Sequence, residues 1–119
     1  MDELAKVFES VADYFGLLSE PARLRILHSL CDDELSVNDI VERTGLTQAN
    51  TSRHLNMLYR ARIVDRRRDG SQVFYWICDS NFKDMCRTVC VAIAARSDVD
   101  QPRRATLRRL EEDLAGKAD

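Results

Sequence analysis

Apolar residues recur at three- and four-residue steps through the first thirty residues. One such stripe predicts a first amphipathic helix and is formed by Leu4, Val7, Phe8, Val11, Phe15 and Leu18. Ser19, Glu20 and Pro21 then mark a break and a new start, because proline is favoured in a first helical turn. A second helix is predicted from there to about Cys31, with apolar positions at Leu24, Ile26, Leu27 and Leu30.

Two short capped segments follow. Ser36 is a suitable N-cap for a third helix that runs through Val41 and Arg43 and ends at Gly45. Thr47 is the N-cap expected for a fourth helix. On this fourth helix one face carries Thr51, Leu55 and Leu58 and is expected to pack inward, which leaves Gln48, Asn50, Ser52 and Arg53 on other faces.

The pattern changes to strands after Ala61. The segments "IVDRR" and "QVFYWIC" flank Asp69 and Gly70, a pair that suits a tight hairpin turn. A last long helix is predicted from its stripe of Phe82, Met85, Cys86, Val89 and Ile93. Pro102 opens a charged segment with Leu107, Leu110 and Leu114.

These elements predict a mainly α (α+β) protein with about five helices and a two-stranded β-hairpin. A short helix, a glycine turn, a polar-faced helix and a basic hairpin, in that order, form a winged helix-turn-helix. We expect residues 1–100 to be one domain, and residues 101–119 to be either a short helix or a frayed tail.

Composition places the chain among ordinary globular proteins. Its 119 residues are 45% hydrophobic and 32% charged. The start "MDELAKVFES" lacks the features of a secretion signal, and no apolar run approaches the roughly 20 residues that span a bilayer. We therefore expect a cytoplasmic protein without a membrane partner, whose four cysteines are thiols.

The net charge of −2 conceals an uneven distribution. From Arg43 to Trp76, seven arginines stand against two aspartates, a local charge of +5, so the rest of the chain carries −7. A basic block on an acidic body suits a protein that presents one face to a polyanion. A solvated run of charges with no partner is the alternative interpretation.

The polar stretch "LTQANTSRHL" at residues 46–55 is the best candidate for that face. Glutamine and asparagine can pair with adenine through two hydrogen bonds, and arginine can do so with guanine. Arg66, Arg67 and Arg68 on the hairpin are suited to phosphates or to the minor groove, and Tyr75 is a further phosphate candidate. The stretch is therefore predicted to read double-stranded DNA.

The sequence supports two other classes of function less well. Catalysis by Ser52 and His54 is disfavoured, because residues two apart on a helix point in nearly opposite directions and no carboxylate is near to orient the imidazole. We predict that the protein is not an enzyme. A winged helix that binds another protein remains an alternative, but such a module has no need of the basic block.

The segments "LLSEPARLRILHSL" and "ELSVNDIVERTGLTQANTSRHLNMLYRARIVDRRRDGSQVFYWI" resemble the ArsR/SmtB family of bacterial winged-helix repressors. The resemblance covers roughly residues 5 to 95. It implies a homodimer joined through the first and last helices, operator binding that blocks transcription, and release by a small inducer. It also implies that Gln48, Ala49, Ser52 and Arg53 read the DNA, with Asn50, Thr51 and His54 close by.

The candidate residues are thus of two kinds. Those for DNA are Gln48, Ala49, Asn50, Thr51, Ser52, Arg53, His54, Arg66, Arg67, Arg68, Gln72 and Tyr75. Those for the dimer interface are Leu4, Val7, Phe8, Val11, Phe15, Phe82, Met85, Val89 and Ile93.

The inducer sites of the family match less well. The "C-V-C" of arsenic and cadmium sensors is replaced by Ser36-Val37-Asn38, and of the zinc ligands only Asp79 is present, where a helix cap is the simpler role. Thiol sensors of the family pair a cysteine on the second helix with one on the last. Here the corresponding elements carry Cys31, Cys86 and Cys90.

Two interpretations of these cysteines stay open. In the first, they sense a thiophilic ion such as As(III), or an oxidant or persulfide. In the second, they only pack in the dimer interface as small apolar side chains. No cofactor is certain, and any metal ligands would come from the same three cysteines. Cys78, at the end of the hairpin, is expected to be a bystander.

Overall fold

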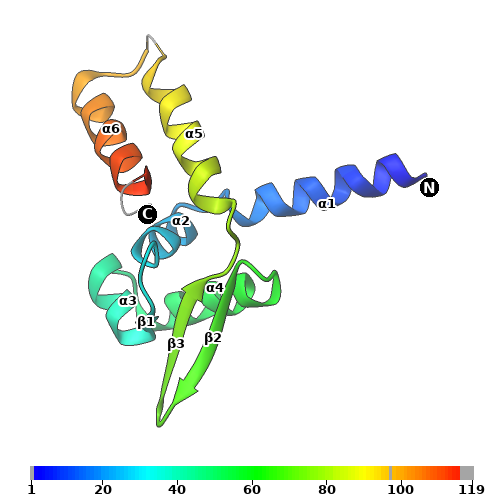
Figure 1. Cartoon of the computed structure of the whole chain (residues 1–119), viewed down its shortest axis with the longest axis vertical. Coiled ribbons are helices and arrows are strands. Elements are labelled where there is room, and N and C mark those ends of the chain that lie inside the picture. The colour runs from blue at the N-terminus through cyan, green and yellow to red at the C-terminus, as the bar shows by residue number, and fades with distance from the viewer. Residues whose placement is uncertain (1, 97, 116–119) are drawn as a thin grey trace. The chain divides into compact units, whose positions relative to one another are not determined.

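The computed structural model describes residues 2–96 and 98–115. The chain forms two compact units, residues 1–78 and residues 79–119, and each is described by itself (Figure 1). The sequence-based expectation that one domain spans residues 1–100 stays a prediction. Within the described residues there are six helices and three strands.

The first helix, α1 (Glu3–Leu17), begins at Asp2, whose carboxylate accepts a hydrogen bond from the backbone N–H of Ala5 at 2.7 Å. None of its residues is buried. The apolar stripe predicted from the sequence is present but faces solvent. Its members are 45% to 64% exposed at Leu4, Val7, Phe8, Val11 and Phe15.

Three helices form the body of the first unit: α2 (Pro21–Ser29), α3 (Val37–Thr44) and α4 (Gln48–Arg60). The predicted caps are confirmed, because Ser36 accepts from the N–H of Asp39 and Thr47 from the N–H of Asn50, each at 3.2 Å. Gly45 ends α3 with φ 75°, a left-handed conformation that glycine adopts without strain. The core between these helices consists of Ile26, Leu27, Leu30, Ile40, Leu55, Leu58 and Ile63, none more than 1% exposed.

The hairpin strands are β2 (Val64–Asp69) and β3 (Gln72–Ile77), and a short strand that was not expected, β1 (Leu35–Ser36), completes an antiparallel sheet in the order β1-β3-β2. The prediction of a two-stranded wing was therefore incomplete. Asp69 pairs with Gln72, so the turn residues are Gly70 and Ser71 rather than Asp69 and Gly70. Gly70 has φ 65°, as the first position of a tight hairpin turn allows.

The second unit is a pair of packed helices, α5 (Phe82–Ala94) and α6 (Gln101–Ala115). Residues 101–115 are thus helical, one of the two alternatives for this segment. Cys90 and Ala94 of α5 and Leu114 of α6 are buried. Arg104 links the two helices, because its guanidinium donates to the carbonyl oxygen of Ala94 at 2.7 Å and to that of Arg96 at 2.8 Å.

The start of α5 differs from the expectation for Asp79. The helix begins after Asn81, whose side chain makes no capping hydrogen bond. Asp79 lies two residues earlier, and its carboxylate accepts from the N–H of Asn81 at 2.9 Å. It therefore holds the turn that leads into the helix. Among the described residues, none of the helices has the length and apolar character needed to cross a bilayer.

Candidate nucleic-acid interface

The first two turns of α4 present a polar surface. Gln48, Ala49, Asn50 and Arg53 are exposed, and Ser52 is half-buried. The guanidinium of Arg53 donates to the side-chain oxygen of Asn50 at 3.2 Å, so these two groups lie side by side. The N-terminal turns of a reading helix are the part that reaches base edges in winged-helix and helix-turn-helix proteins.

Two of the residues predicted to contact DNA, Thr51 and His54, lie on the inner face of the helix, which for Thr51 confirms the expectation that it packs inward. Thr51 is fully buried, and its hydroxyl donates to the carbonyl oxygen of Thr47 at 2.8 Å. His54 is only 4% exposed. Their prediction as DNA contacts is therefore corrected. The sequence held the necessary signal, because Thr51, His54, Leu55 and Leu58 follow the i, i+3, i+4, i+7 spacing of one buried helical face.

His54 has a defined partner inside the unit. Its Nδ1 atom accepts a hydrogen bond from Nε of Arg23 at 3.2 Å, so the neutral ring carries its proton on Nε2. Burial lowers the pKa of His54 below 6.5, and the positive charges of Arg53 and Arg23 lower it further. Arg23 also donates to the carbonyl oxygens of Leu17 at 3.1 Å and Gly16 at 3.4 Å. One guanidinium thus joins the C-terminal end of α1 to α4.

The three successive arginines of β2 are not equivalent. A strand alternates its side chains between two faces, so Arg66 and Arg68 share one face and Arg67 lies on the other. Arg67 binds Glu34 through a salt bridge and lies over the ring of Phe74 at 5.0 Å from its centroid. Arg68 is exposed, and its side chain makes no hydrogen bond or ion pair with the residues that the structure describes.

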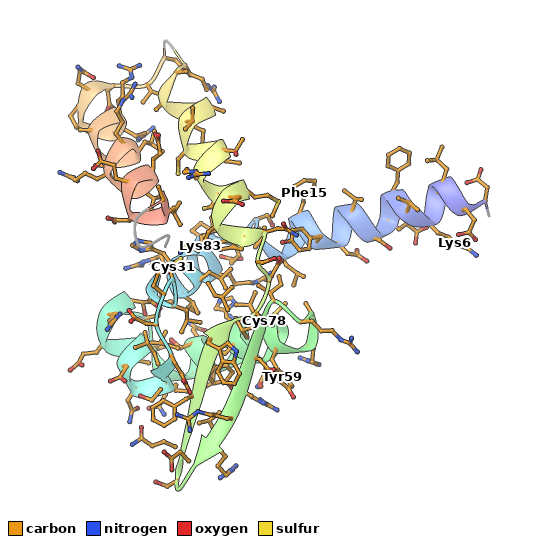
Figure 2. The ribbon with its side chains drawn as sticks, viewed as in Figure 1. Lys6, Phe15, Cys31, Tyr59, Cys78 and Lys83 are labelled. Atoms are coloured by element: carbon orange, nitrogen blue, oxygen red, sulfur yellow. The ribbon has the colours of Figure 1, made fainter. Side chains whose placement is uncertain are left out.

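Arg66 is engaged within the protein. Its guanidinium carbon lies 3.9 Å from the centroid of the Tyr59 ring, and Nη1 donates to Asn56 and to the hydroxyl of Tyr75. Figure 2 shows Tyr59 near the end of α4, beside the hairpin. Tyr75 itself is 5% exposed, so its prediction as a phosphate contact is corrected as well. Gln72, by contrast, is exposed.

A pocket of about 190 Å³ lies between the start of α3, the start of α4 and the hairpin turn. It brings together Gln48, Ser52 and Gln72, which were predicted to contact DNA from two separate elements. Asn38 and Ser71 also line it and were not predicted. No sequence signal marks these two, because their position depends on how the hairpin folds back toward α3.

The four cysteines are free thiols and differ in exposure. Cys31 is half-buried in the first unit, where its Sγ donates to the carbonyl oxygen of Leu27 at 3.5 Å. In the second unit, burial raises the pKa of Cys86, and the adjacent Cys90 raises it further. Burial and the negative charge of Glu111 raise the pKa of Cys90. Both thiols of the second unit are therefore protonated at neutral pH.

The described part of the chain does not group enough metal-binding side chains for a metal site. Among the residues that the structure describes, no three His, Cys, Asp or Glu side chains are grouped so as to hold a metal ion. A structural or sensing site for zinc uses about four ligands. The cysteines therefore supply an adjacent pair of thiols rather than a complete coordination shell.

Comparison with known proteins identifies the family. Residues 20–66 match the family model described as bacterial regulatory protein, arsR family. The chain is 42% identical over 65 residues to the HTH-type transcriptional regulator KmtR of Mycobacterium tuberculosis, covering 55% of this chain and 50% of that protein. It is 44% identical to the cadmium resistance transcriptional regulatory protein CadC of Listeria innocua, over 57% of this chain and 58% of that protein.

The chain thus spans only about half the length of these two relatives. It covers 93% of an uncharacterized HTH-type transcriptional regulator from Methanocaldococcus jannaschii, at 34% identity over 69% of this chain. Each of these relatives is a transcriptional regulator by name rather than an enzyme.

Solved structures agree with this fold. The crystal structure of NolR from Sinorhizobium fredii has a TM-score of 0.72 at 26% identity, over 81% of this chain and 96% of that one. A homodimeric winged helix-turn-helix DNA-binding domain from Mycobacterium bovis, described as a possible ArsR-family transcriptional regulator, has a TM-score of 0.68 at 28% identity, over 78% and 86% of the two chains. The capped α3–α4 pair, the hairpin and these matches lead to one conclusion. The chain is a winged helix-turn-helix protein and belongs to the ArsR family of bacterial regulatory proteins.

Proposed function

We propose that the protein binds double-stranded operator DNA in the cytoplasm and represses transcription. The observation that carries the proposal is the exposed polar surface on the first two turns of α4, a capped helix whose other face is anchored in the core. Gln48, Ala49, Asn50, Ser52 and Arg53 read base edges in the major groove. Arg68 and Gln72 extend the contact from the hairpin to the neighbouring backbone or minor groove.

The protein acts as a homodimer in this proposal. The apolar face of α1 is left uncovered, with Phe8 64% exposed and Phe15 59% exposed. On α5, Val89 is 53% exposed. Patches of this kind on otherwise polar helices are typical of protein interfaces. The Mycobacterium bovis domain is homodimeric, which supports the same assembly here through the two predicted helices, with Met85 and Ile93 as further members. Phe82 is 2% exposed and adds little free apolar surface of its own.

Retention of genomic DNA fragments on filters, at two salt concentrations, tests the function. A DNA-binding dimer retains fragments at low salt and loses them steeply as salt rises, because each phosphate contact releases counterions. The retained fragments should share a palindrome with half-sites about one helical turn apart. A module that binds only protein retains no fragment at either salt concentration, and that outcome would refute the proposal.

We further propose that the inducer acts on thiols. The adjacent pair Cys86 and Cys90 supports this, and CadC is a cadmium resistance regulator by name. Because burial raises the pKa of both thiols, a weak oxidant that needs thiolate reacts slowly with them. A strongly thiophilic ion such as As(III) competes directly with the thiol protons, so it is the favoured class of inducer. The ligand beyond this pair, for which Cys31 is the candidate, stays a prediction.

Cysteine variants test this second part separately. Arsenite should dissociate the wild-type protein from its operator, whereas Cys90→Ser and Cys31→Ser should bind DNA and fail to respond. Cys78→Ser is the matched control, because Cys78 is an exposed thiol outside the pair, and it should respond as the wild type does. A variant with all four cysteines changed to serine that is still induced would show that the cysteines only pack.

A further inference from the structure

The basic run Arg66-Arg67-Arg68 looks like a single phosphate-binding patch in the sequence, but the strand divides it. Arg66 pairs with Tyr75 in the sheet register and Arg68 with Val73, so both side chains lie on the face that carries the buried Val64. Arg66 is nearer the core and Arg68 nearer the turn. The two residues therefore have the same charge and face but different surroundings.

The guanidinium of Arg66 is held by three side chains. Its Cζ atom lies 3.9 Å from the centroid of the Tyr59 ring, a distance at which cation–π attraction is favourable. Nη1 donates to Oδ1 of Asn56 at 3.2 Å and to the hydroxyl oxygen of Tyr75 at 3.4 Å. Asn56 and Tyr59 belong to the second half of α4, and Tyr75 belongs to β3. We call these four residues the Arg66 cluster.

The cluster joins the two elements that would touch DNA. Its α4 members, Asn56 and Tyr59, lie about two to three turns beyond the reading residue Gln48 and about one to two turns beyond Arg53. Arg66 itself lies two residues before Arg68 on β2. The hydrogen bond that Arg66 donates to the hydroxyl of Tyr75 raises the pKa of Arg66, and the guanidinium is charged at every physiological pH. A guanidinium can stack and donate in its plane at the same time, which an ammonium cannot do.

We propose that Arg66 is a positioning residue rather than a phosphate contact. It sets the angle between the hairpin and the reading helix, so that Arg68 meets the DNA backbone while Gln48 and Arg53 meet the bases. This inference rests on the proposed DNA-binding function. Pre-organisation of this kind increases affinity because the hairpin need not be ordered during binding.

DNA affinity and its salt dependence separate the two roles. Arg66→Lys keeps the charge but loses the planar guanidinium that stacks on Tyr59 and donates to Asn56 and Tyr75. It should therefore weaken binding to a retained genomic fragment roughly three- to tenfold. Arg43→Lys, the matched control, makes the same exchange at a residue that pairs with Asp33 outside the cluster and outside the proposed DNA contacts, and it should bind within about twofold of wild type. Arg68→Gln should lower the salt slope by about one, whereas Arg66→Gln should leave the slope unchanged.

Amide hydrogen exchange of residues 65–69 in the free protein provides a second measurement that needs no DNA. Arg66→Lys and Tyr59→Leu should speed exchange in β2, whereas Tyr59→Phe, which keeps the ring, and Arg68→Lys should not. A wild-type affinity for Arg66→Lys, a slope lowered by about one in Arg66→Gln, or unchanged exchange in Arg66→Lys would overturn the inference. If the wild type binds no DNA at any salt, the proposed function fails, and the exchange rates still decide whether the cluster holds the hairpin.

Discussion

Helices α1 and α4 are both amphipathic, yet the structure uses their apolar faces in opposite ways. Helix α4 buries Thr51, His54, Leu55 and Leu58 within its own unit. Helix α1 buries none of its 15 residues, although its stripe contains two phenylalanines. Figure 2 shows Lys6 and Phe15 on opposite sides of α1. The apolar residues of the helix are exposed, with Phe15 59% exposed.

The difference shows which parts of the molecule are complete in one chain. The inner face of α4 is buried in the core, which holds its exposed outer face at a fixed position. The apolar face of α1 is open, and large exposed patches of this kind mark interfaces. A hydrophobic stripe in a sequence therefore predicts a helix, but does not predict whether the same chain covers it.

The largest effect on the free energy of unfolding is expected from a substitution on the buried face of α4. Leu55→Ala should lower the free energy of unfolding by about 2–5 kcal/mol, because Leu55 is fully buried and its removal leaves a cavity. Asn50→Ala on the outer face of the same helix should change it by no more than about 0.5 kcal/mol. Urea denaturation measures both values. A loss below about 1 kcal/mol for Leu55→Ala would mean that α4 is not anchored as described.

A change in the exposed apolar face of α1 should affect dimer formation rather than the stability of the fold. Val11→Asp places a charge in the proposed dimer seam and should raise the dimer dissociation constant by at least roughly a hundredfold. Ser10→Asp adds the same charge to α1 outside the stripe and should leave the dimer intact. Sedimentation at micromolar concentration distinguishes the two. A wild-type monomer that binds its operator normally would contradict the dimer.

Substitutions on the outer face of α4 should alter the sequence specificity of DNA binding. Arg53→Ala and Gln48→Ala should each cost about 1–3 kcal/mol of binding free energy and relax the preference at particular base pairs. Competition between duplexes that differ at single base pairs measures the preference. Equal weakening on every sequence would instead assign these residues to phosphate contacts.

The smallest effect concerns the junction between the two helices. The pKa of His54 is lowered in the folded protein, so the unfolded chain binds the extra proton more readily. The contribution of neutral His54 to the free energy of unfolding is therefore fully present above about pH 6.5 and is lost as pH falls from there through the lower pKa of the folded state. His54→Asn keeps an acceptor for Arg23 without titrating, and should show a smaller fall in the urea midpoint between about pH 7.5 and pH 5.5. An identical fall in both proteins would place the acid sensitivity elsewhere.

Local features were predictable from the sequence because their causes are local. Ser36, Gly45 and Thr47 mark the ends of α3 and α4 as expected, since capping and left-handed turns involve residues only a few positions apart. Strand β1 was not predictable, because its two residues are a strand only through pairing with Phe74 and Tyr75.

Some of the candidate DNA-binding residues could likewise be predicted from local sequence, and others could not. The polar face of α4 follows from helical periodicity, and its exposure agrees with the sequence at Gln48, Asn50 and Arg53. The role of Arg66 does not follow, because its partners Asn56 and Tyr59 come from another element. Three identical side chains in a row thus have three different environments, which only the folded hairpin determines.

The left-handed turn at Gly45 has a consequence for chemical synthesis. No atom lies within 4 Å of the position that a Cβ would occupy there, so the requirement for glycine comes from φ 75° and not from crowding. L-alanine would be strained by about 1–2 kcal/mol in this conformation. A D-alanine of opposite chirality prefers it, and would also reduce the freedom of the unfolded chain. The turn between the two helices of the helix-turn-helix is therefore a place where a D-amino acid should fit better than any natural residue.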